Sequence, residues 1–236
     1  MVASALIDSV KGYIRRDTAK GAALRTTLAE LLRPCPDTVI FGGLLREFAL
    51  GKAETFASDI DLVTSVSRQD LFQAIRHFDP KNNKFGGYRF VVSDQSFDIW
   101  AFEDTWAFRE GVVQGVAFSD LLKTTFFNLD AAAYHLTTEE CWCHDRYTEM
   151  VRQGILELNL EENPRPKRMA MRAIDMAIAN KLALGPRLAT FVLGQLRREE
   201  LRTFALPFWE GLKSHVDRSP DSAYRFRART SLGRSP

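Results

Sequence analysis

Three aspartates of this chain stand in patterns that could support metal-ion chemistry. Asp59 and Asp61 flank Ile60 at the start of one apolar run, and Asp98 lies between two apolar residues in another. Because side chains of a β-strand alternate between its two faces, Asp59 and Asp61 are expected to point the same way while Ile60 points into the core. Neighbouring carboxylates repel each other unless a cation lies between them. Asp59, Asp61 and Asp98 are therefore the predicted catalytic residues and ligands of magnesium, with manganese as the alternative.

A glycine pair gives a second pattern, one that suits phosphate. Gly42 and Gly43 follow the β-branched and aromatic run 38–41 and precede the stretch 44–50, which predicts a strand, a turn and a helix. Backbone amides at the start of a helix favour an anion such as a triphosphate. Gly42, Gly43 and Arg46 are the predicted nucleotide contacts. Two cations held by the three carboxylates would activate an attacking hydroxyl and stabilise a leaving pyrophosphate.

The elements that must position these residues follow from periodicity and turn residues. Four-residue apolar spacing predicts helices within 1–33, and a capping pattern at Ser67 predicts another helix. After about residue 119 the pattern is mostly helical, with a long helix over 167–184. A short apolar alternation over 155–160 is the exception. Strands are expected at 38–41, 60–64, 88–92 and 96–102, the last two joined by a turn at 93–95.

The expected fold class is α+β: a small mixed β-sheet head flanked by helices, followed by a helical domain. We expect the head over 1–118, the helical domain over 119–216 and a flexible arginine-containing tail over 217–236. The chain has 236 residues with a formal charge of +2, so any basic surface must be local. No apolar run approaches the roughly 20 residues that a membrane helix needs. Its three cysteines fit a reducing cytoplasm.

The segment 42–64 resembles the signature of bacterial poly(A) polymerases and tRNA CCA-adding enzymes, in the polymerase-beta superfamily. Gly-Gly-Leu-Leu-Arg-Glu at 42–47 is similar to their Gly-Gly-x-x-Arg-Asp, with Glu47 where Asp is usual, and 59–62 reads Asp-Ile-Asp-Leu. Asp98 falls on the strand where relatives place a third carboxylate. The resemblance implies a nucleotidyltransferase that moves a nucleoside monophosphate from an NTP to an acceptor hydroxyl and releases pyrophosphate.

The resemblance continues more weakly beyond the head. Residues 127–134 are similar to the family's Phe-Thr-Ile-Asn-Ala-Leu-Ala-Tyr, with Asp130 in the Asn position, but the Arg-Arg-Asp that normally precedes it is absent. The family's base-reading segment is echoed at 161–165 and by Arg168 and Arg172. These two arginines lie four apart, so they share one helix face. Nucleotide binding and an ordinary solvated face are both open for them.

The resemblance implies a tRNA-like RNA 3′ end as the acceptor and an NTP, with ATP favoured, as the donor. The alternative is a compact, toxin-like transferase that modifies a protein or a small molecule. Its support is the altered second motif and the lack of room for the RNA-gripping body of the tRNA enzymes. A non-catalytic nucleotide- or RNA-binding module is a third hypothesis. The three carboxylates weigh against it, because a binding module has no need to hold like charges together.

Overall fold

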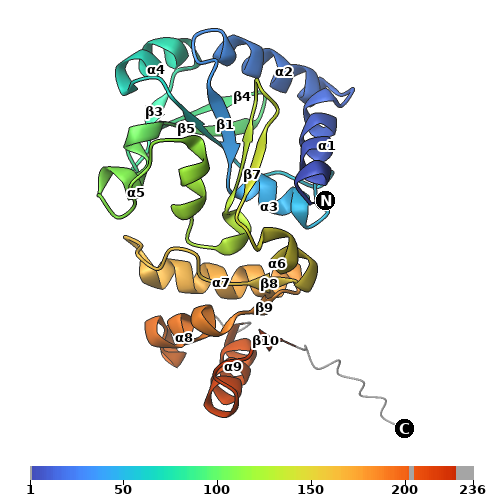
Figure 1. Cartoon of the computed structure of the whole chain (residues 1–236), viewed down its shortest axis with the longest axis vertical. Coiled ribbons are helices and arrows are strands. Elements are labelled where there is room, and N and C mark those ends of the chain that lie inside the picture. The colour runs from blue at the N-terminus through green and yellow to red at the C-terminus, as the bar shows by residue number, and fades with distance from the viewer. Residues whose placement is uncertain (1, 202–204, 227–236) are drawn as a thin grey trace. The chain divides into compact units, whose positions relative to one another are not determined.

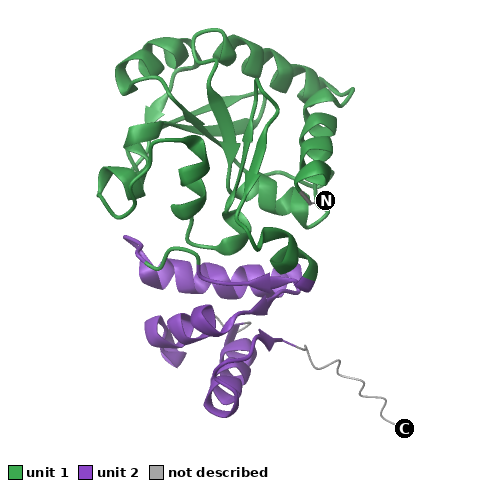
Figure 2. Cartoon of the chain, in the orientation of Figure 1, with its two compact units in different colours: residues 1–152, 159–161 green, residues 153–158, 162–236 purple. Residues whose placement is uncertain are grey.

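The structure of the chain is a computed structural model that describes residues 2–201 and 205–226. It comprises two compact units, residues 1–152 with 159–161, and residues 153–158 with 162–236 (Figure 2). Within the described residues, no helix has the length and apolar character needed to cross a membrane.

The first unit is built on a seven-stranded mixed sheet (Figure 1). The strand order is β3-β4-β5-β2-β1-β6-β7, and β2 and β5 pair in parallel while the other neighbours are antiparallel. This confirms the predicted α+β class. The strands are β1 (Thr38–Phe41), β2 (Ile60–Thr64), β3 (Lys81–Asn82), β4 (Tyr88–Val92), β5 (Gln95–Ala101), β6 (Ala132–His135) and β7 (Cys141–Cys143).

Helices cover one face of this sheet and bury the main core. Leu6 and Val10 of the first helix, and Leu24 and Leu28 of the second, pack in one cluster with the inward side chains of the central strands. Thr18 begins the second helix, its hydroxyl accepting a hydrogen bond from the backbone N–H of Gly21 at 3.0 Å. The helices of this unit are α1 (Val2–Arg15), α2 (Ala19–Leu32), α3 (Gly43–Ala49), α4 (Arg68–Ile75), α5 (Trp106–Arg109) and α6 (Tyr147–Gln153).

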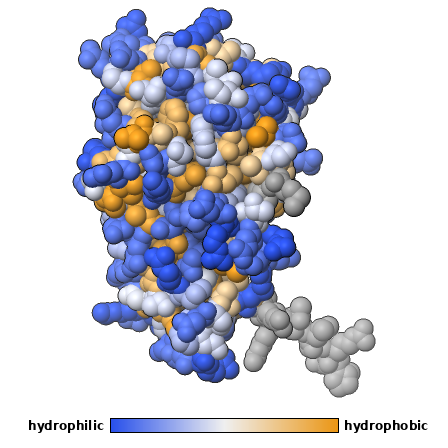
Figure 3. Space-filling model, viewed as in Figure 1, coloured by the Kyte–Doolittle hydropathy of each residue, from blue (hydrophilic) through white to orange (hydrophobic). Residues whose placement is uncertain are grey.

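The other face of the sheet is covered only in part. Val39 and Val63 pack there with Leu121 of a 3-10 helix, η3 (Phe118–Lys123), and with partly buried aromatic side chains. Figure 3 shows apolar patches among hydrophilic residues on the face of the molecule in view. Three further 3-10 turns join the elements of the unit: η1 (Arg76–Phe78), η2 (Phe102–Asp104) and η4 (Asn128–Asp130).

A two-residue turn fixes the register of β4 against β5. Ser93 and Asp94 have φ of 48° and 63°, the left-handed pair of a type I′ hairpin. Val92 therefore pairs with Gln95, and Arg89 with Asp98. We predicted a turn over 93–95, one residue too long, because Gln95 is polar and reads as part of the turn.

The sheet extends beyond the predicted end of the head at residue 118. Strands β6 and β7 lie within the segment that we expected to be mostly helical. Alanine favours helices in isolation, so residues 131–133 give no local signal for a strand. Here Ala132 and Ala133 are fully buried between β1 and β7, so tertiary packing decides the conformation.

The second unit combines helices with a small sheet of order β10-β9-β8. Its third helix packs against its second, and the second against its first. The predicted helix over 167–184 is shorter, because Lys181 adopts a left-handed φ of 54° and ends it. The elements are β8 (Ile155–Leu156), α7 (Pro166–Asn180), β9 (Ala183–Leu184), α8 (Pro186–Gln195), η5 (Arg198–Glu200), α9 (Leu206–Arg218) and β10 (Tyr224–Arg225).

The predicted flexible tail, 217–236, overlaps this unit. Helix α9 continues to Arg218, and the guanidinium of Arg225 donates to the carbonyl oxygens of Lys181 at 2.7 Å and Gln153 at 2.9 Å. Residues 217–226 thus belong to folded structure, which the serine- and arginine-rich composition did not reveal. Residues 227–236 lie outside the described part of the chain.

The hairpin turn gives a stability prediction. Asp94→Val should lower the free energy of unfolding by about 1–2 kcal/mol, because a β-branched residue resists left-handed backbone. Asp94→Gly should not lower it, since glycine adopts positive φ freely. Urea unfolding of both variants measures the difference, and equal stability of the two would contradict the turn assignment.

Candidate active site

The parallel pairing of β2 and β5 brings two of the predicted aspartates side by side. Asp61 and Asp98 are register partners on adjacent strands. Their neighbours Ile60 and Phe97 are almost fully buried in the helix-covered core. Alternation therefore directs Asp61 and Asp98 to the opposite, partly covered face of the sheet. Asp59, two residues before Asp61, belongs to the same side.

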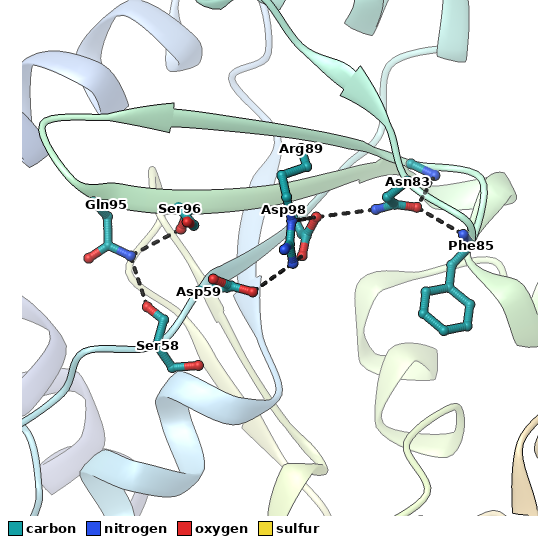
Figure 4. Close-up of polar contacts among 9 residues, drawn as sticks. Ser58, Asp59, Asn83, Phe85, Arg89, Gln95, Ser96 and Asp98 are labelled. Atoms are coloured by element: carbon teal, nitrogen blue, oxygen red, sulfur yellow. Dashed lines mark hydrogen bonds and ion pairs between the residues drawn. The ribbon is translucent and has the colours of Figure 1, made fainter. Parts of the chain in front are cut away.

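Arg89 joins two of these carboxylates (Figure 4). Its Nε donates to Oδ1 of Asp98 at 3.0 Å, and its Nη2 donates both to Oδ2 of Asp59 at 2.6 Å and to Oδ2 of Asp98. The hydrogen bond to Asp98, supported by the charges of Asp98, Asp59 and Asp61, raises the pKa of Arg89 above its ordinary value. The sequence analysis missed this arginine.

Asn83 is a second residue that the sequence analysis missed. Its Nδ2 donates to Oδ1 of Asp98 at 3.3 Å, while its Oδ1 accepts from the backbone N–H groups of Phe85 and Gly87 at 3.0 Å each. The amide thus ties the loop before β4 to the carboxylate of β5, as Figure 4 shows. An Asn at the start of a Gly-Gly-containing loop was the available signal, since Asn side chains often fold back on nearby backbone.

The carboxylates fit a divalent cation by their chemistry. No three His, Cys, Asp or Glu side chains of the described residues already stand in a metal-holding arrangement. Two of the three aspartates are instead bound by the Arg89 guanidinium, whose positive charge lies between them. Three carboxylates and one guanidinium leave a charge of −2 on the cluster, and hard oxygen donors suit magnesium or manganese.

Gly42 and Gly43 form the turn between β1 and α3. Gly42 has φ 75° and ψ −122°, a conformation that essentially only glycine adopts. Its N–H donates to the carbonyl of Ala132 at 3.2 Å, so this amide is already used within the sheet. A Cβ at Gly42 would lie 4.0 Å from Oδ2 of Asp61, which places the turn beside the carboxylates. Gly43 is the first residue of α3.

Arg46, a predicted nucleotide contact, is paired with two acids in the structure. Its buried guanidinium pairs with Glu47, at 3.1 Å from Nε, and with Asp130. Burial would lower the pKa of Arg46, but the charges of Asp130 and Glu47 outweigh it, so the pKa is raised. Both acids were noted as departures from the family pattern, and they meet on this one arginine. In these contacts Arg46 links α3 to η4.

Arg168 and Arg172 belong to the second unit. Both are exposed on α7, whose opposite side buries Ala170, Ala173 and Ile174. They share one face, as their spacing predicted. Their basic character is available to a ligand of that unit.

The Arg46 pair gives the second prediction. Asp130→Ala should lower the free energy of unfolding by about 3 kcal/mol, because a buried guanidinium loses a partner. Asp130→Asn, which keeps an oxygen acceptor, should cost clearly less, and Glu103→Ala on the exposed surface should change stability by less than about 0.5 kcal/mol. Urea unfolding is the measurement, and an Asp130→Ala variant as stable as the parent would show that Glu47 alone suffices.

Solved CCA-adding enzymes have a similar structure. The Thermotoga maritima CCA-adding enzyme complexed with tRNA matches with a TM-score of 0.59 and 16% identity, over 86% of this chain and 49% of that one. CCA-adding enzyme complexes with CTP and with ATP match with TM-scores of 0.57 and 0.53, each at 15% identity, over 88% and 83% of this chain and 49% of theirs. No family model and no curated protein sequence matches. The chain spans about half the length of these structures and shares the fold of the part that it matches.

Proposed function

We propose that this chain is a metal-dependent nucleotidyltransferase that moves a nucleoside monophosphate from an NTP, with ATP favoured, to the 3′ hydroxyl of a tRNA-like RNA. The observation that carries the proposal is the gathering of Asp61 and Asp98 on paired strands, with Asp59 joined to Asp98 through Arg89. The fold adds support, because solved proteins that share it are complexes with tRNA, ATP and CTP.

Each residue has a role in this proposal. Asp59 and Asp61 would hold both cations, and Asp98 would hold the one nearer the acceptor. Bound divalent cations lower the pKa of an attacking hydroxyl and stabilise a leaving pyrophosphate. Asn83 keeps Asp98 oriented through its 3.3 Å hydrogen bond. Gly42, which carries no side chain beside Asp61, would leave room for substrate there, and the start of α3 at Gly43 would bind the triphosphate.

The direct test follows a label. The protein is incubated with each α-labelled NTP and magnesium or manganese, alone and with bulk tRNA, and the labelled product is identified. Label at the 3′ end of RNA supports the proposal. Label in protein or in a small molecule favours the compact transferase with another acceptor, and no transfer under any condition favours a binding module.

The third prediction concerns the carboxylates in that assay. Asp59→Asn and Asp61→Asn should each reduce transfer by at least about a hundredfold, because each removes a negatively charged ligand. Neither should unfold the protein, since Asp61→Asn relieves repulsion and Asp59→Asn removes only a solvent-exposed ion pair with Arg89. Asp79→Asn, a change at an exposed left-handed position that Asn tolerates, serves as the control. Near-normal transfer by either site variant would remove these residues from catalysis.

The fourth prediction tests RNA as the partner. If Arg168 and Arg172 contact phosphates, Arg168→Gln/Arg172→Gln should weaken RNA binding and flatten the plot of log affinity against log salt by about 0.7 per lost contact. Arg187→Gln, another exposed arginine of this unit, is the control. Filter binding across a salt series measures both quantities, and an unchanged slope would assign these arginines to a solvated face.

The role of the arginine-containing tail in RNA binding is tested by truncation, and the position of the cut decides what is measured. Truncation after Val216 would remove β10 and the Arg225 hydrogen bonds, so it would disturb the second unit. Truncation after Phe226 leaves all described structure in place. The shorter deletion therefore isolates the contribution of 227–236 to RNA affinity.

A further inference from the structure

The guanidinium of Arg89 lies where a shared cation would bind. One nitrogen, Nη2, donates to Oδ2 of Asp59 at 2.6 Å and to Oδ2 of Asp98 as well. Magnesium binds carboxylate oxygens at about 2.0–2.1 Å, so a cation bridging the same two oxygens would occupy the position of this nitrogen. The guanidinium and such a cation exclude each other there.

The arginine can leave without disturbing the core. The side chain of Arg89 is 50% exposed, whereas that of Asp98 is 10% exposed. The backbone of Arg89 is fixed by the hairpin pairing with Asp98, but its guanidinium makes its described contacts only with Asp59 and Asp98. Side-chain rotation toward solvent therefore breaks the hydrogen bonds to Asp59 and Asp98 and exposes further a side chain that is already half exposed.

Asp98 stays oriented when the guanidinium leaves. Asn83 still donates to its Oδ1, and the Asn83 side chain is held by the backbone N–H groups of Phe85 and Gly87. The carboxylate thus keeps one donor that carries no charge and does not compete with a cation at Oδ2.

Building on the proposed function, we propose that Arg89 is a built-in competitor of the catalytic cation and sets its affinity. A divalent cation binds by displacing the guanidinium from Asp59 and Asp98. A divalent charge gains more from this acidic cluster than a monovalent guanidinium does, so the exchange is driven by the net −2 that Arg89 leaves unbalanced. The arginine holds the carboxylates together until the cation arrives.

The test is cation binding, measured without nucleotide. Mn²⁺ affinity is determined by calorimetry and by electron paramagnetic resonance for the parent protein, Arg89→Gln, Arg89→Lys and Arg76→Gln. Arg89→Gln should bind Mn²⁺ roughly tenfold to a hundredfold more tightly, because charge-assisted hydrogen bonds no longer have to be broken. Arg89→Lys should lie between, since an ammonium cannot make the paired contacts of a guanidinium. Arg76→Gln, the loss of an exposed arginine on η1, should match the parent.

Melting temperatures with and without Mn²⁺ give an independent test of the competition between Arg89 and the cation. Without divalent cation, Arg89→Gln should melt at a lower temperature than the parent, because the carboxylates lose their counter-charge. Added Mn²⁺ should raise its melting temperature more than that of the parent. Adding Asp59→Asn to Arg89→Gln should cancel most of the gain in affinity, which places the bound ion at these carboxylates.

Equal or weaker Mn²⁺ binding by Arg89→Gln would overturn the competition. This result is separable from failure of the proposed function. If no nucleotide is transferred but Arg89→Gln binds Mn²⁺ more tightly than the parent, the competition stands and the transferase assignment falls. If transfer occurs and depends on Asp59 but Arg89→Gln leaves Mn²⁺ affinity unchanged, the transferase stands and the competition falls.

Discussion

Like charge on adjacent strands is the constraint on which the rest of this site depends. The parallel register of β2 and β5 sets Asp61 beside Asp98, an arrangement that repulsion alone would open. Two forces oppose it. On the far face, Ile60 and Phe97 are buried with the helices and hold the strands together through apolar contact. On the near face, Arg89 reaches across from β4 and neutralises part of the charge. Acidic chemistry on one face is thus maintained by packing on the other.

Charge is also balanced by opposite charge at the buried guanidinium of Arg46. Glu47 and Asp130 stand where the motifs of CCA-adding enzymes usually have Asp and Asn. Taken separately, each looks like a substitution without consequence. In the structure both acids contact the one buried guanidinium. A buried charge without such partners would be costly, whereas a surrounded one is tolerated. The two departures are therefore coupled, and the pair links α3, which follows the glycine turn, to η4, which precedes β6.

The sequence predicted the elements with the clearest periodicity and missed what depends on register. Strands 38–41 and 60–64 have the predicted bounds, because β-branched and apolar residues define them and glycine or polar residues end them. The hairpin turn was predicted one residue too long. A three-residue turn would pair Arg89 with Ile99 in place of Asp98, and a slip of one residue also turns every side chain to the other face. The left-handed φ values of Ser93 and Asp94 make the turn two residues long. The pair Ser-Asp does not indicate such a turn as clearly as Asn-Gly does. The alanine-rich strand β6 was missed for another reason, since only its burial between two strands makes it extended.

Asp98 is the aspartate whose position depends on the largest number of other segments. Its carboxylate accepts from Arg89 on the neighbouring strand and from Asn83 in the loop before that strand. Asp59 and Asp61 come from a single strand end and would be expected in any fold that carries their motif. Asp98 instead needs three segments in correct register: β5 to carry it, the two-residue turn to bring Arg89 opposite, and the folded loop to present Asn83. A third carboxylate held in this way has its orientation set by the chain before any substrate arrives, and pre-set orientation is what lets fixed charges act on a reacting group without reorganisation.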